Sequence, residues 1–170
     1  WRSWDHFLIT DTLDSLTKPT VDLVHGNTVA VDYDGNLLIS CRNMSEITKI
    51  DRQTGQIIWR LGGKNNQFTF VNEDPPYFHY QHDIRRLPNG NLTLFDNRNG
   101  LEPQYSRAVE YHIDEANRVA TRVWEYRNTP DTYGAVMGNA QRLPNGNTMI
   151  GWGSGGLLTE VKPDGPRHWS

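Results

Sequence analysis

A short turn motif recurs three times in the 170 residues at a nearly constant interval. The sequence reads DGN at residues 34–36 and NGN at 89–91 and 145–147, so the closing asparagines, Asn36, Asn91 and Asn147, lie 55 and then 56 residues apart. A fixed period of this length is typical of repeat architectures built from one supersecondary unit. Asn-Gly and Asp-Gly pairs favour the positive φ angles of a two-residue hairpin turn, so each motif predicts two antiparallel strands around it.

Each unit also contains a second predicted hairpin. Short β-rich runs flank the three motifs, and further hairpin patterns follow at residues 46–63, 107–127 and 157–170. A tryptophan stands on the last predicted strand of each unit, at Trp59, Trp124 and Trp169. No segment shows a sustained helical period. We therefore expect four antiparallel strands in each unit of about 55 residues.

Four-stranded antiparallel units in tandem predict an all-β fold, a β-propeller of which three blades are visible. The predicted blades are residues 24–61, 80–127 and 137–170 of a single propeller fragment, 1–170, and residues 1–6 are expected to be the last strand of a preceding blade. The alternative is a row of separate hairpin domains, but a lone four-stranded sheet cannot bury both of its faces.

Three blades do not close a ring, since propellers typically have about four to eight. The remaining blades are expected from the same longer chain or from a second copy. The start at Trp1, without an initiator methionine, fits a mature fragment or the ordered part of a longer protein.

Composition argues against several kinds of partner and site. The net charge is -3, the pI is about 6.1 and no run of Lys or Arg exceeds two residues, so neither a nucleic acid nor an anionic membrane surface is an expected partner. No apolar stretch approaches the ~20 residues of a membrane span. Cys41 is the single cysteine, which excludes an internal disulfide and a CxxC metal site. We expect it to be a small core residue.

Polar residues collect where the predicted strands meet long loops. Because successive strands are antiparallel, the turn motifs share one face of the propeller and the long loops share the other, at residues 7–24, 62–81, 97–105 and 128–138. Function usually resides in long loops on a rigid scaffold. His25 and His82 stand at the entry to the first strand of the first two blades. Histidine at such a position can act as an acid, a base or a nucleophile.

Arginines are predicted at the same face. The second strand of the second blade ends at Asp96, Asn97 and Arg98, which antiparallel pairing should bring next to His82. Arg42 follows the second strand of the first blade, and Arg107 begins the third strand of the second blade. Arginine forms planar, multidentate hydrogen bonds to oxyanions, so this set predicts a site for a small anionic ligand.

Each of these residues also has a structural interpretation. A single histidine at a strand start often makes only a local hydrogen bond, and Asp96 and Asn97 can simply cap a turn. A zinc site from His79 and His82 lacks a third ligand at recognisable spacing. The prediction therefore includes no metal and no cofactor.

Five strings appear in order between residues 25 and 111: HGN at 25–27, IIWRLGGK at 57–64, QHD at 81–83, FDN at 95–97 and SRAVEY at 106–111. With them the sequence resembles the arylsulfotransferase family of six-bladed propellers. The resemblance implies three blades of six and transfer of a sulfuryl group from an aryl sulfate to a phenol, without a nucleotide sulfate donor, through a transiently sulfurylated histidine. It also implies a secreted, periplasmic or cell-surface location.

The resemblance extends to single residues. His25 in HGN and His82 in QHD match family histidines, and the family arginine is best matched by Arg98, with Arg107 as a second candidate. We therefore predict His82 as general base or nucleophile, and His25 and Arg98 as catalytic residues that hold the sulfate. The predicted substrate-binding residues are Asn97, Arg42 and Arg107.

One departure keeps other functions open. The nucleophilic histidine of the family follows a glycine-rich segment, but here residues 151–161 read GWGSGGLLTEV and contain no histidine. A propeller that binds a ligand without turnover, or one used in structural or surface assembly, remains an alternative to the enzyme.

Overall fold

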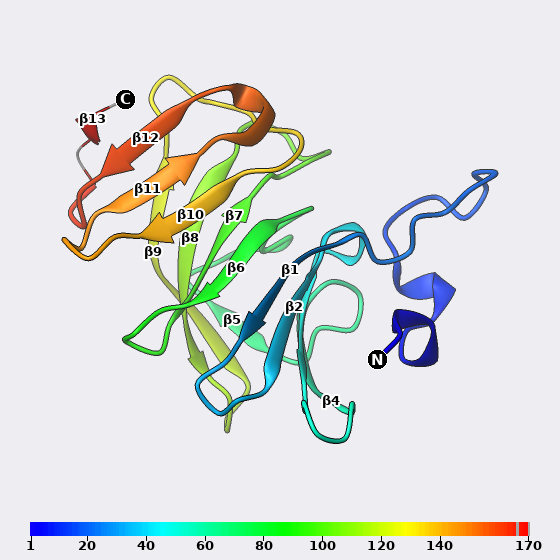
Figure 1. Cartoon of the computed structure of the whole chain (residues 1–170). Coiled ribbons are helices and arrows are strands. Elements are labelled where there is room, and N and C mark those ends of the chain that lie inside the picture. Colours follow the sequence, from blue (N-terminus) through cyan, green and yellow to red (C-terminus); the bar gives the residue numbers. More distant parts are fainter. Residues whose placement is uncertain (166, 170) are drawn as a thin grey trace.

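The computed structural model describes residues 1–165 and 167–169, the last three by their backbone only, and contains three sheets (Figure 1). Sheet 1 contains β1 (Gly26–Val31), β2 (Leu37–Cys41), β3 (Glu46–Ile50) and β4 (Ile57–Gly62). Sheet 2 contains β6 (His82–Arg86), β7 (Leu92–Asp96), β8 (Arg107–Asp114), β9 (Val119–Arg127) and the short β5 (Thr69–Val71). Sheet 3 contains β10 (Asn139–Arg142), β11 (Thr148–Gly151), β12 (Leu158–Val161) and β13 (Arg167–Trp169). The all-β prediction is confirmed.

Each sheet is built on four antiparallel strands that pair in chain order, one sheet for each repeat. The sequence did not predict β5, which lies in the expected loop 62–81 and pairs parallel with the outer strand β9. Within the described residues the helices are four single 3-10 turns, η1 (Ser3–Asp5), η2 (Ile9–Asp11), η3 (Arg42–Met44) and η4 (Gly153–Gly155). No helix in this part of the chain is long and apolar enough to cross a membrane.

The turn motifs form three-residue loops instead of the predicted two-residue turns. In the second motif the Gly90 N–H donates to Leu87 O at 2.9 Å and the Leu87 N–H donates to Asn91 O at 2.8 Å. Gly90 has φ +88, whereas Asn89 is not among the residues with positive φ. A type I′ turn needs positive φ at both central residues, so this is a type I turn followed by a left-handed glycine. The same pattern recurs at Gly35 and Gly146.

The closing asparagine of the motif fastens the hairpin to the next strand. Asn91 Nδ2 donates to Glu110 Oε1 at 2.6 Å, and the carboxylate of Glu110 is almost completely buried in β8. Asn147 and Glu160 make the equivalent contact at 2.7 Å in sheet 3. A buried carboxylate needs such donors because leaving it unpaired is costly. In sheets 2 and 3 the asparagine is therefore explained by this pairing as well as by turn conformation, whereas Asn36 of sheet 1 accepts the backbone N–H of Arg52 at 3.1 Å.

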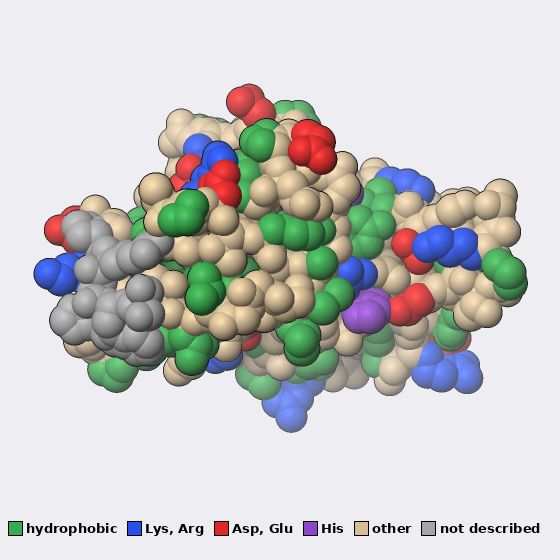
Figure 2. Space-filling view, turned by 90° about the horizontal axis from the view of Figure 1, so that it is seen from above, with side chains coloured by type: hydrophobic (Ala, Val, Ile, Leu, Met, Phe, Trp, Pro, Cys, Tyr) green, Lys and Arg blue, Asp and Glu red, His purple; other side chains and the backbone are tan. Residues whose placement is uncertain are grey.

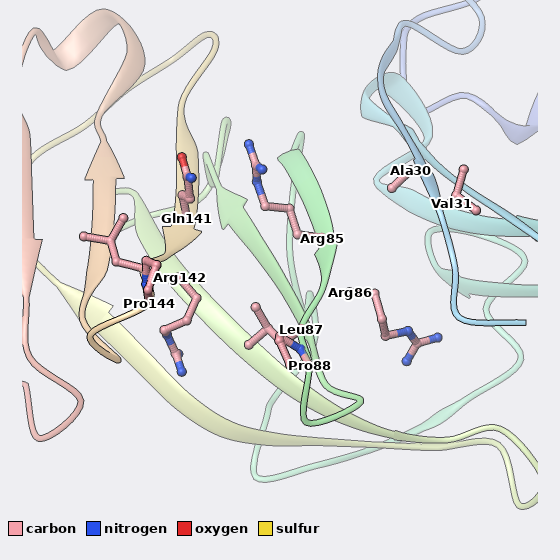
Figure 3. A pocket seen from close by; sticks show the side chains of 10 residues that line it. Ala30, Val31, Arg85, Arg86, Leu87, Pro88, Gln141, Arg142 and Pro144 are labelled. Carbon is pink, nitrogen blue, oxygen red and sulfur yellow. The ribbon is translucent and has the colours of Figure 1, made fainter. Parts of the chain in front are cut away.

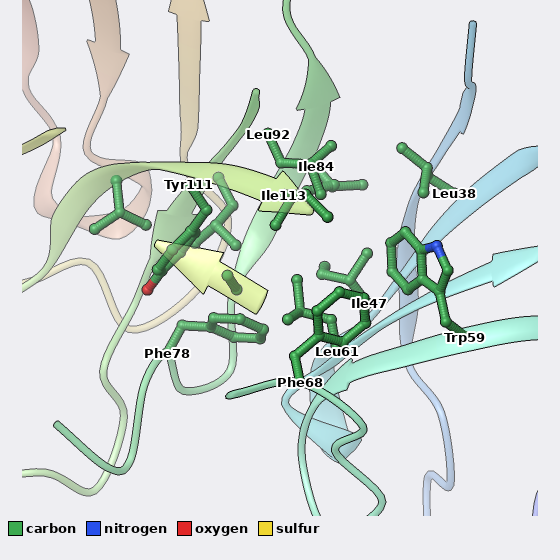
Figure 4. Close-up of a cluster of buried hydrophobic side chains, with 13 residues drawn as sticks. Leu38, Ile47, Trp59, Leu61, Phe68, Phe78, Ile84, Leu92, Tyr111 and Ile113 are labelled. Carbon is green, nitrogen blue, oxygen red and sulfur yellow. The ribbon is translucent and has the colours of Figure 1, made fainter. Parts of the chain in front are cut away.

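The sheets pack face to face through apolar side chains. Leu38, Ile47 and Trp59 of sheet 1 lie in one buried cluster with Ile84 and Leu92 of sheet 2 (Figure 4). Burying side chains of this size stabilises the fold by roughly 1.5–3 kcal/mol each. All five residues of β7 are buried, because this strand has sheet 1 on one side and sheet 3 on the other.

A second cluster joins sheets 2 and 3. The ring of Phe95 in β7 meets Trp152 edge to face, with 5.8 Å between ring centroids. Of the tryptophans predicted on the outer strands, Trp59 is fully buried and Trp124 packs against this second cluster. The side chain of Trp169, and residues 166 and 170 of the third predicted unit, lie outside the described residues.

Residues 1–6 do not form the predicted strand. A strand needs a neighbouring strand to receive its backbone hydrogen bonds, and here Ser3–Asp5 makes a 3-10 turn instead. Trp1 Nε1 donates to Gly55 O at 3.0 Å, which ties this segment to the turn of sheet 1. Phe7 then packs with Cys41 on the far face of that sheet. Cys41 is fully buried, as expected, and burial raises the pKa of its thiol to about 12.

The first strands of the three sheets, β1, β6 and β10, lie next to one another (Figure 1). One residue of β6 links all three. The Asp83 N–H donates to Thr28 Oγ1 at 3.1 Å, and Asp83 Oδ2 accepts from the Ala140 N–H at 3.0 Å. The described residues thus form an open row of three sheets rather than a closed ring.

Candidate functional site

The starts of β1, β6 and β10, the ends of β2 and β7 and the loop before β10 lie at one end of the sheets, which we call the loop end; the turn motifs lie at the other, the turn end (Figure 1). Part of the long loop 62–81 reaches the turn end, where β5 pairs with the start of β9. Figure 2 looks down on the molecule from above and shows acidic and basic side chains mixed, without a broad field of one charge. A ligand at the loop end would therefore be held by individual side chains and not by a general potential.

His82 and Asn97 meet at the loop end of sheet 2. His82 is the first residue of β6 and pairs with Phe95 of β7, so the residue that follows β7, Asn97, reaches the imidazole. His82 Nδ1 lies 2.8 Å from Asn97 Oδ1. Burial lowers the pKa of His82 below its ordinary value of 6.5, and the charge of Arg42 acts in the same direction. The imidazole is therefore neutral at pH 7.

Arg42 brings a positive charge close to this histidine. It directly follows β2, and its guanidinium lies over the ring of Tyr80, 4.8 Å from the centroid. Its terminal nitrogens donate to Asn43 Oδ1 at 2.8 Å and, over a long 3.4 Å, to Ala135 O. No carboxylate forms an ion pair with Arg42 anywhere in residues 1–165, so its charge is available to an anion.

His25 lies just outside sheet 1. β1 begins at Gly26, and the backbone of His25 is left-handed, with φ +48. Its ring is exposed, and Nδ1 lies 2.5 Å from Asp22 Oδ2. The carboxylate of Asp22 would have to be displaced or offset before His25 could face an anion.

Arg98 makes no hydrogen bond to His82, although the sequence predicted that they are neighbours. Its backbone is left-handed at φ +58, and its N–H donates to His79 O at 2.9 Å. Its guanidinium lies over the Tyr105 ring, 4.3 Å from the centroid, and Arg127 lies over the same ring at 3.6 Å. Arg98 Nε is buried without a hydrogen-bond partner among the described residues. The Nε of Arg98 is therefore free to bind another group, although the guanidinium stacks on Tyr105.

Arg107 is enclosed by carboxylates and is not positioned as a substrate ligand. Nε donates to Asp96 at 2.9 Å, Nη1 to Glu125 at 2.8 Å and Nη2 to Glu73 at 3.0 Å. Only 4% of its side chain is exposed. Burial is the largest single influence and would lower the pKa of Arg107, but the charges of Asp96, Glu73 and the other acidic neighbours together outweigh it and raise the pKa above its ordinary value. Arg107 is thus a charged anchor of sheet 2, in contrast to the substrate-binding role expected from sequence.

The sequence placed the loop before β10 on the same face as the site but predicted no site residue in it. Asn97 Nδ2 donates to Gly134 O at 2.7 Å and to Met137 O at 2.8 Å, so this loop of the third unit contacts the histidine partner of the second. A Cβ on Gly134 would lie 2.2 Å from Trp152 O, and one on Gly138 would lie 2.3 Å from the Phe95 ring. These two glycines are the sequence signal that could have revealed the loop, because such close approaches leave no room for a side chain.

Two clefts accompany these residues. The larger, about 470 Å³, lies at the turn end between β1, β6 and β10 and is lined by Arg86 and Arg142 among others (Figure 3). Arg86 already forms an ion pair with Asp32, and Arg142 already forms one with Glu110. Neither guanidinium group is therefore free to bind an anion in this cleft. The smaller, about 260 Å³, is mainly apolar, is lined by Pro75, Pro76, Tyr77 and Phe78, and has Ser45 and His79 at its wall.

His79 and His82 have different hydrogen-bond partners. His79 Nδ1 lies 2.6 Å from Asn99 O, while His82 is bonded to Asn97. Across the described ranges, 1–165 and 167–169, there is no group of three or more His, Cys, Asp or Glu side chains arranged to hold a metal ion.

Comparison with known structures supports a propeller-type fold. The PQQ-bound form of an aldose sugar dehydrogenase from Streptomyces coelicolor, a propeller-type protein, superposes with a TM-score of 0.54 at 17% sequence identity. The match covers 91% of this chain and 48% of that one. At this identity the likeness concerns the fold alone.

Comparison of sequences identifies relatives of known name. Arylsulfate sulfotransferase AssT of Escherichia coli O6:H1 is 29% identical over 178 aligned residues, covering 84% of this chain and 29% of that protein. AssT of Lelliottia amnigena is 32% identical over 100 residues, covering 53% of this chain and 17% of that protein. The chain therefore spans less than a third of the length of these relatives. The sequence profile of the arylsulfotransferase (ASST) family matches residues 9–166, and the chain belongs to that family.

Proposed function

We propose that this chain forms part of an arylsulfotransferase-type site, in which a sulfuryl group passes from an aryl sulfate to a phenolic acceptor at the loop end. The observation that carries the proposal is the position of His82, bonded to Asn97 at the loop end, with Arg42 on the ring of Tyr80, two residues before it, and without a carboxylate partner in the described residues. Burial and the charge of Arg42 lower the pKa of His82, so its imidazole is neutral at pH 7. Membership of the family supports the reaction class. A neutral imidazole can attack sulfur or accept a proton, and an arginine stabilises the charge on the sulfuryl oxygens.

The proposed chemistry has two steps. An unprotonated nitrogen of His82 attacks the sulfur of the aryl sulfate; an N–S bond forms, the S–O bond to the aryl group breaks, and the phenolate leaves and takes up a proton. The acceptor phenol then attacks the same sulfur, the N–S bond breaks, and the phenol proton passes to a base. If His82 instead serves as that base, the nucleophile is supplied by another histidine of the complete protein. Arg42 and His25 would hold the sulfuryl oxygens, and Arg98 is a further candidate for this role.

The mainly apolar 260 Å³ pocket supports the aryl part of the proposal. Its wall includes Ser45, whose Oγ accepts the backbone N–H of Tyr80 at 3.0 Å, and Tyr80 is the ring under Arg42. An aromatic ring could therefore lie against Phe78 while its sulfate faces the cation. Pockets for small ligands combine such apolar walls with a few polar groups.

The test uses the complete protein, because this chain spans only part of its relatives and we propose that further blades complete the ring. The protein is incubated with p-nitrophenyl sulfate and a phenol, and nitrophenol release is followed by absorbance. We expect release that requires the phenol and is abolished by His82→Ala with an unchanged circular dichroism spectrum. His112→Ala is the control, since His112 lies exposed on β8. Undiminished release by His82→Ala would refute the assignment of His82.

A binding protein without turnover is the second candidate. Residues 151–161 contain no histidine, and Trp152 and Gly153 are packed against Phe95 and the loop before β10. Isothermal titration with p-nitrophenyl sulfate separates the candidates: saturable binding that Arg42→Ala weakens, without nitrophenol release, would favour this one.

A further inference from the structure

The orientation of the Asn97 amide is determined by its surroundings. Asn97 is completely buried, and one end of its amide lies within 2.8 Å of two backbone carbonyl oxygens, those of Gly134 and Met137. Carbonyl oxygens only accept hydrogen bonds, so this end must be the NH₂ group. The amide oxygen is then the atom that faces His82. Had the amide been turned over, two carbonyl oxygens would face a third oxygen in a buried place.

The same reasoning assigns the proton of His82. Asn97 Oδ1 can only accept, and it lies 2.8 Å from His82 Nδ1. In the neutral ring one nitrogen carries the proton and the other a lone pair. The nitrogen that faces Oδ1 must therefore be the protonated one, which leaves the lone pair on Nε2. In water a histidine side chain prefers the opposite tautomer, with the proton on Nε2.

We propose that Asn97 is a positioning residue, which the loop at residues 134–137 holds in one orientation so that His82 is kept as the Nδ1-protonated tautomer and Nε2 is the reactive nitrogen. This assigns Asn97 a different role from the substrate-binding one that its position in the sequence suggested. The consequence for catalysis rests on the proposed function, whereas the tautomer itself does not.

The loop is anchored independently of Asn97. The Gly134 N–H donates to Ser106 Oγ at 2.9 Å, and the Ser154 N–H donates to Val136 O at 3.0 Å. A Cβ on Gly153 would lie 2.2 Å from the same Val136 oxygen, so the glycine-rich segment permits the loop to approach. The segment that lacks the family histidine thus fixes the partner of a histidine in the neighbouring unit.

A neighbouring amide provides a matched control. Asn99 Nδ2 donates to Ala135 O at 2.8 Å, so it binds the same loop as Asn97. Asn99 makes no hydrogen bond to His82 among the described residues. If Asn97 only tied sheet 2 to the third unit, the two asparagines would be equivalent in every measurement.

The experiment is ¹⁵N NMR of the complete protein labelled at histidine, at a pH where His82 is neutral, with its signals assigned by their loss in His82→Gln. Unprotonated and protonated ring nitrogens have well separated ¹⁵N shifts. We expect wild-type His82 to show a protonated Nδ1 and an unprotonated Nε2. Asn97→Ala should move both signals toward the Nε2-protonated form, and Asn99→Ala should leave them in place. A protonated Nε2 or an averaged signal in the wild type would overturn the inference without any variant, so it remains testable if Asn97→Ala does not fold.

Kinetics separate this inference from the proposed function. With p-nitrophenyl sulfate, Asn97→Ala should lower kcat by about 10-fold or more with little change in KM, as expected when a group is misoriented and binding is kept. Asn99→Ala should retain the wild-type kcat. Equal losses in both variants would overturn the positioning role. The predicted tautomer in a protein without turnover would instead refute the enzyme and leave the inference standing.

Discussion

Asp32 is the centre of an ion network that joins sheet 1 to sheet 2 at the turn end. Its oxygens accept from Arg86 Nε at 2.7 Å and from Lys49 Nζ at 2.9 Å, and only 3% of its side chain is exposed. Both cations also pair with Glu115, in the turn between β8 and β9. Asp32→Asn removes the central charge and keeps the shape of the side chain.

The structure gives the size of the expected effect. Burial alone would raise the pKa of Asp32, but the hydrogen bonds from Arg86 and Lys49 outweigh it and lower the pKa from 3.8 to about 2. One pKa unit corresponds to about 1.4 kcal/mol, so Asp32 contributes roughly 2.5 kcal/mol to the free energy of unfolding at pH 7. Because the folded pKa is the lower one, this stabilisation is complete above pH 3.8 and is lost as the pH falls toward 2.

Urea unfolding followed by tryptophan fluorescence measures this difference, because the buried Trp59 donates to Glu115 at 2.9 Å in the same network. We expect Asp32→Asn to lower the free energy of unfolding by roughly 2.5 kcal/mol at pH 7, and by clearly less near pH 3. Asp74→Asn, at an exposed position without an ion pair among the described residues, is the control for removal of one charge. A difference that stays the same from pH 7 to pH 3, or one no larger than that of the control, would refute the reasoning.

Three further predictions concern the motif asparagines, the arginines and His82. Asn147→Ala, which removes the 2.7 Å donor of the buried Glu160, should lower the free energy of unfolding by about 1–2 kcal/mol, and a change within ±0.3 kcal/mol in urea unfolding would contradict this. Arg107→Met should lower it by about 3–5 kcal/mol because the buried Asp96 loses its ion-pair partner and Glu73 and Glu125 each lose one of two, whereas Arg98→Met should lower it by less than about 1 kcal/mol; equal values in the same assay would argue against the different roles. Turnover of p-nitrophenyl sulfate by the complete protein should rise as His82 loses its proton and reach half of its maximum below pH 6.5, because the folded pKa of His82 is lowered; a pH profile that still rises at pH 8 would show that another group is titrating.

The turn motifs show how far local sequence reaches. Asn-Gly at 89–90 predicted a hairpin, and β6 and β7 flank it as expected. The turn type was wrong, because Asn-Gly fits both a two-residue turn and a three-residue loop with glycine in the left-handed region. Strand register decides between them, and register follows from the faces that the two strands bury. The hydrogen bond from Asn91 to Glu110 could not be predicted from the local sequence either, because Glu110 lies 19 residues away.

The arginines show what the local sequence could not predict. Arg98 and Arg107 lie nine positions apart in one unit, and both were candidates for the anion site. Arg107 is instead a buried anchor because Glu73 and Glu125, 34 and 18 residues away, converge on it. Desolvation makes a buried guanidinium bind carboxylates where they are available, and nothing in the neighbouring sequence reveals which arginine will meet them.

The sequence by itself determined the repeat, the four strands of each repeat, the all-β fold and the family, because turn chemistry, alternation and motif order are local properties of the chain; it did not determine β5 or the conformation of residues 1–6. It also placed His82, Asn97 and Arg42 at strand ends of the same face. Only the tertiary structure decided what these residues do there. The loop before β10, from the next repeat, fixes the Asn97 amide, and Asn97 in turn assigns the proton of His82. Hydrogen-bond direction depends on which donors and acceptors meet in space, and here those partners come from two different repeats.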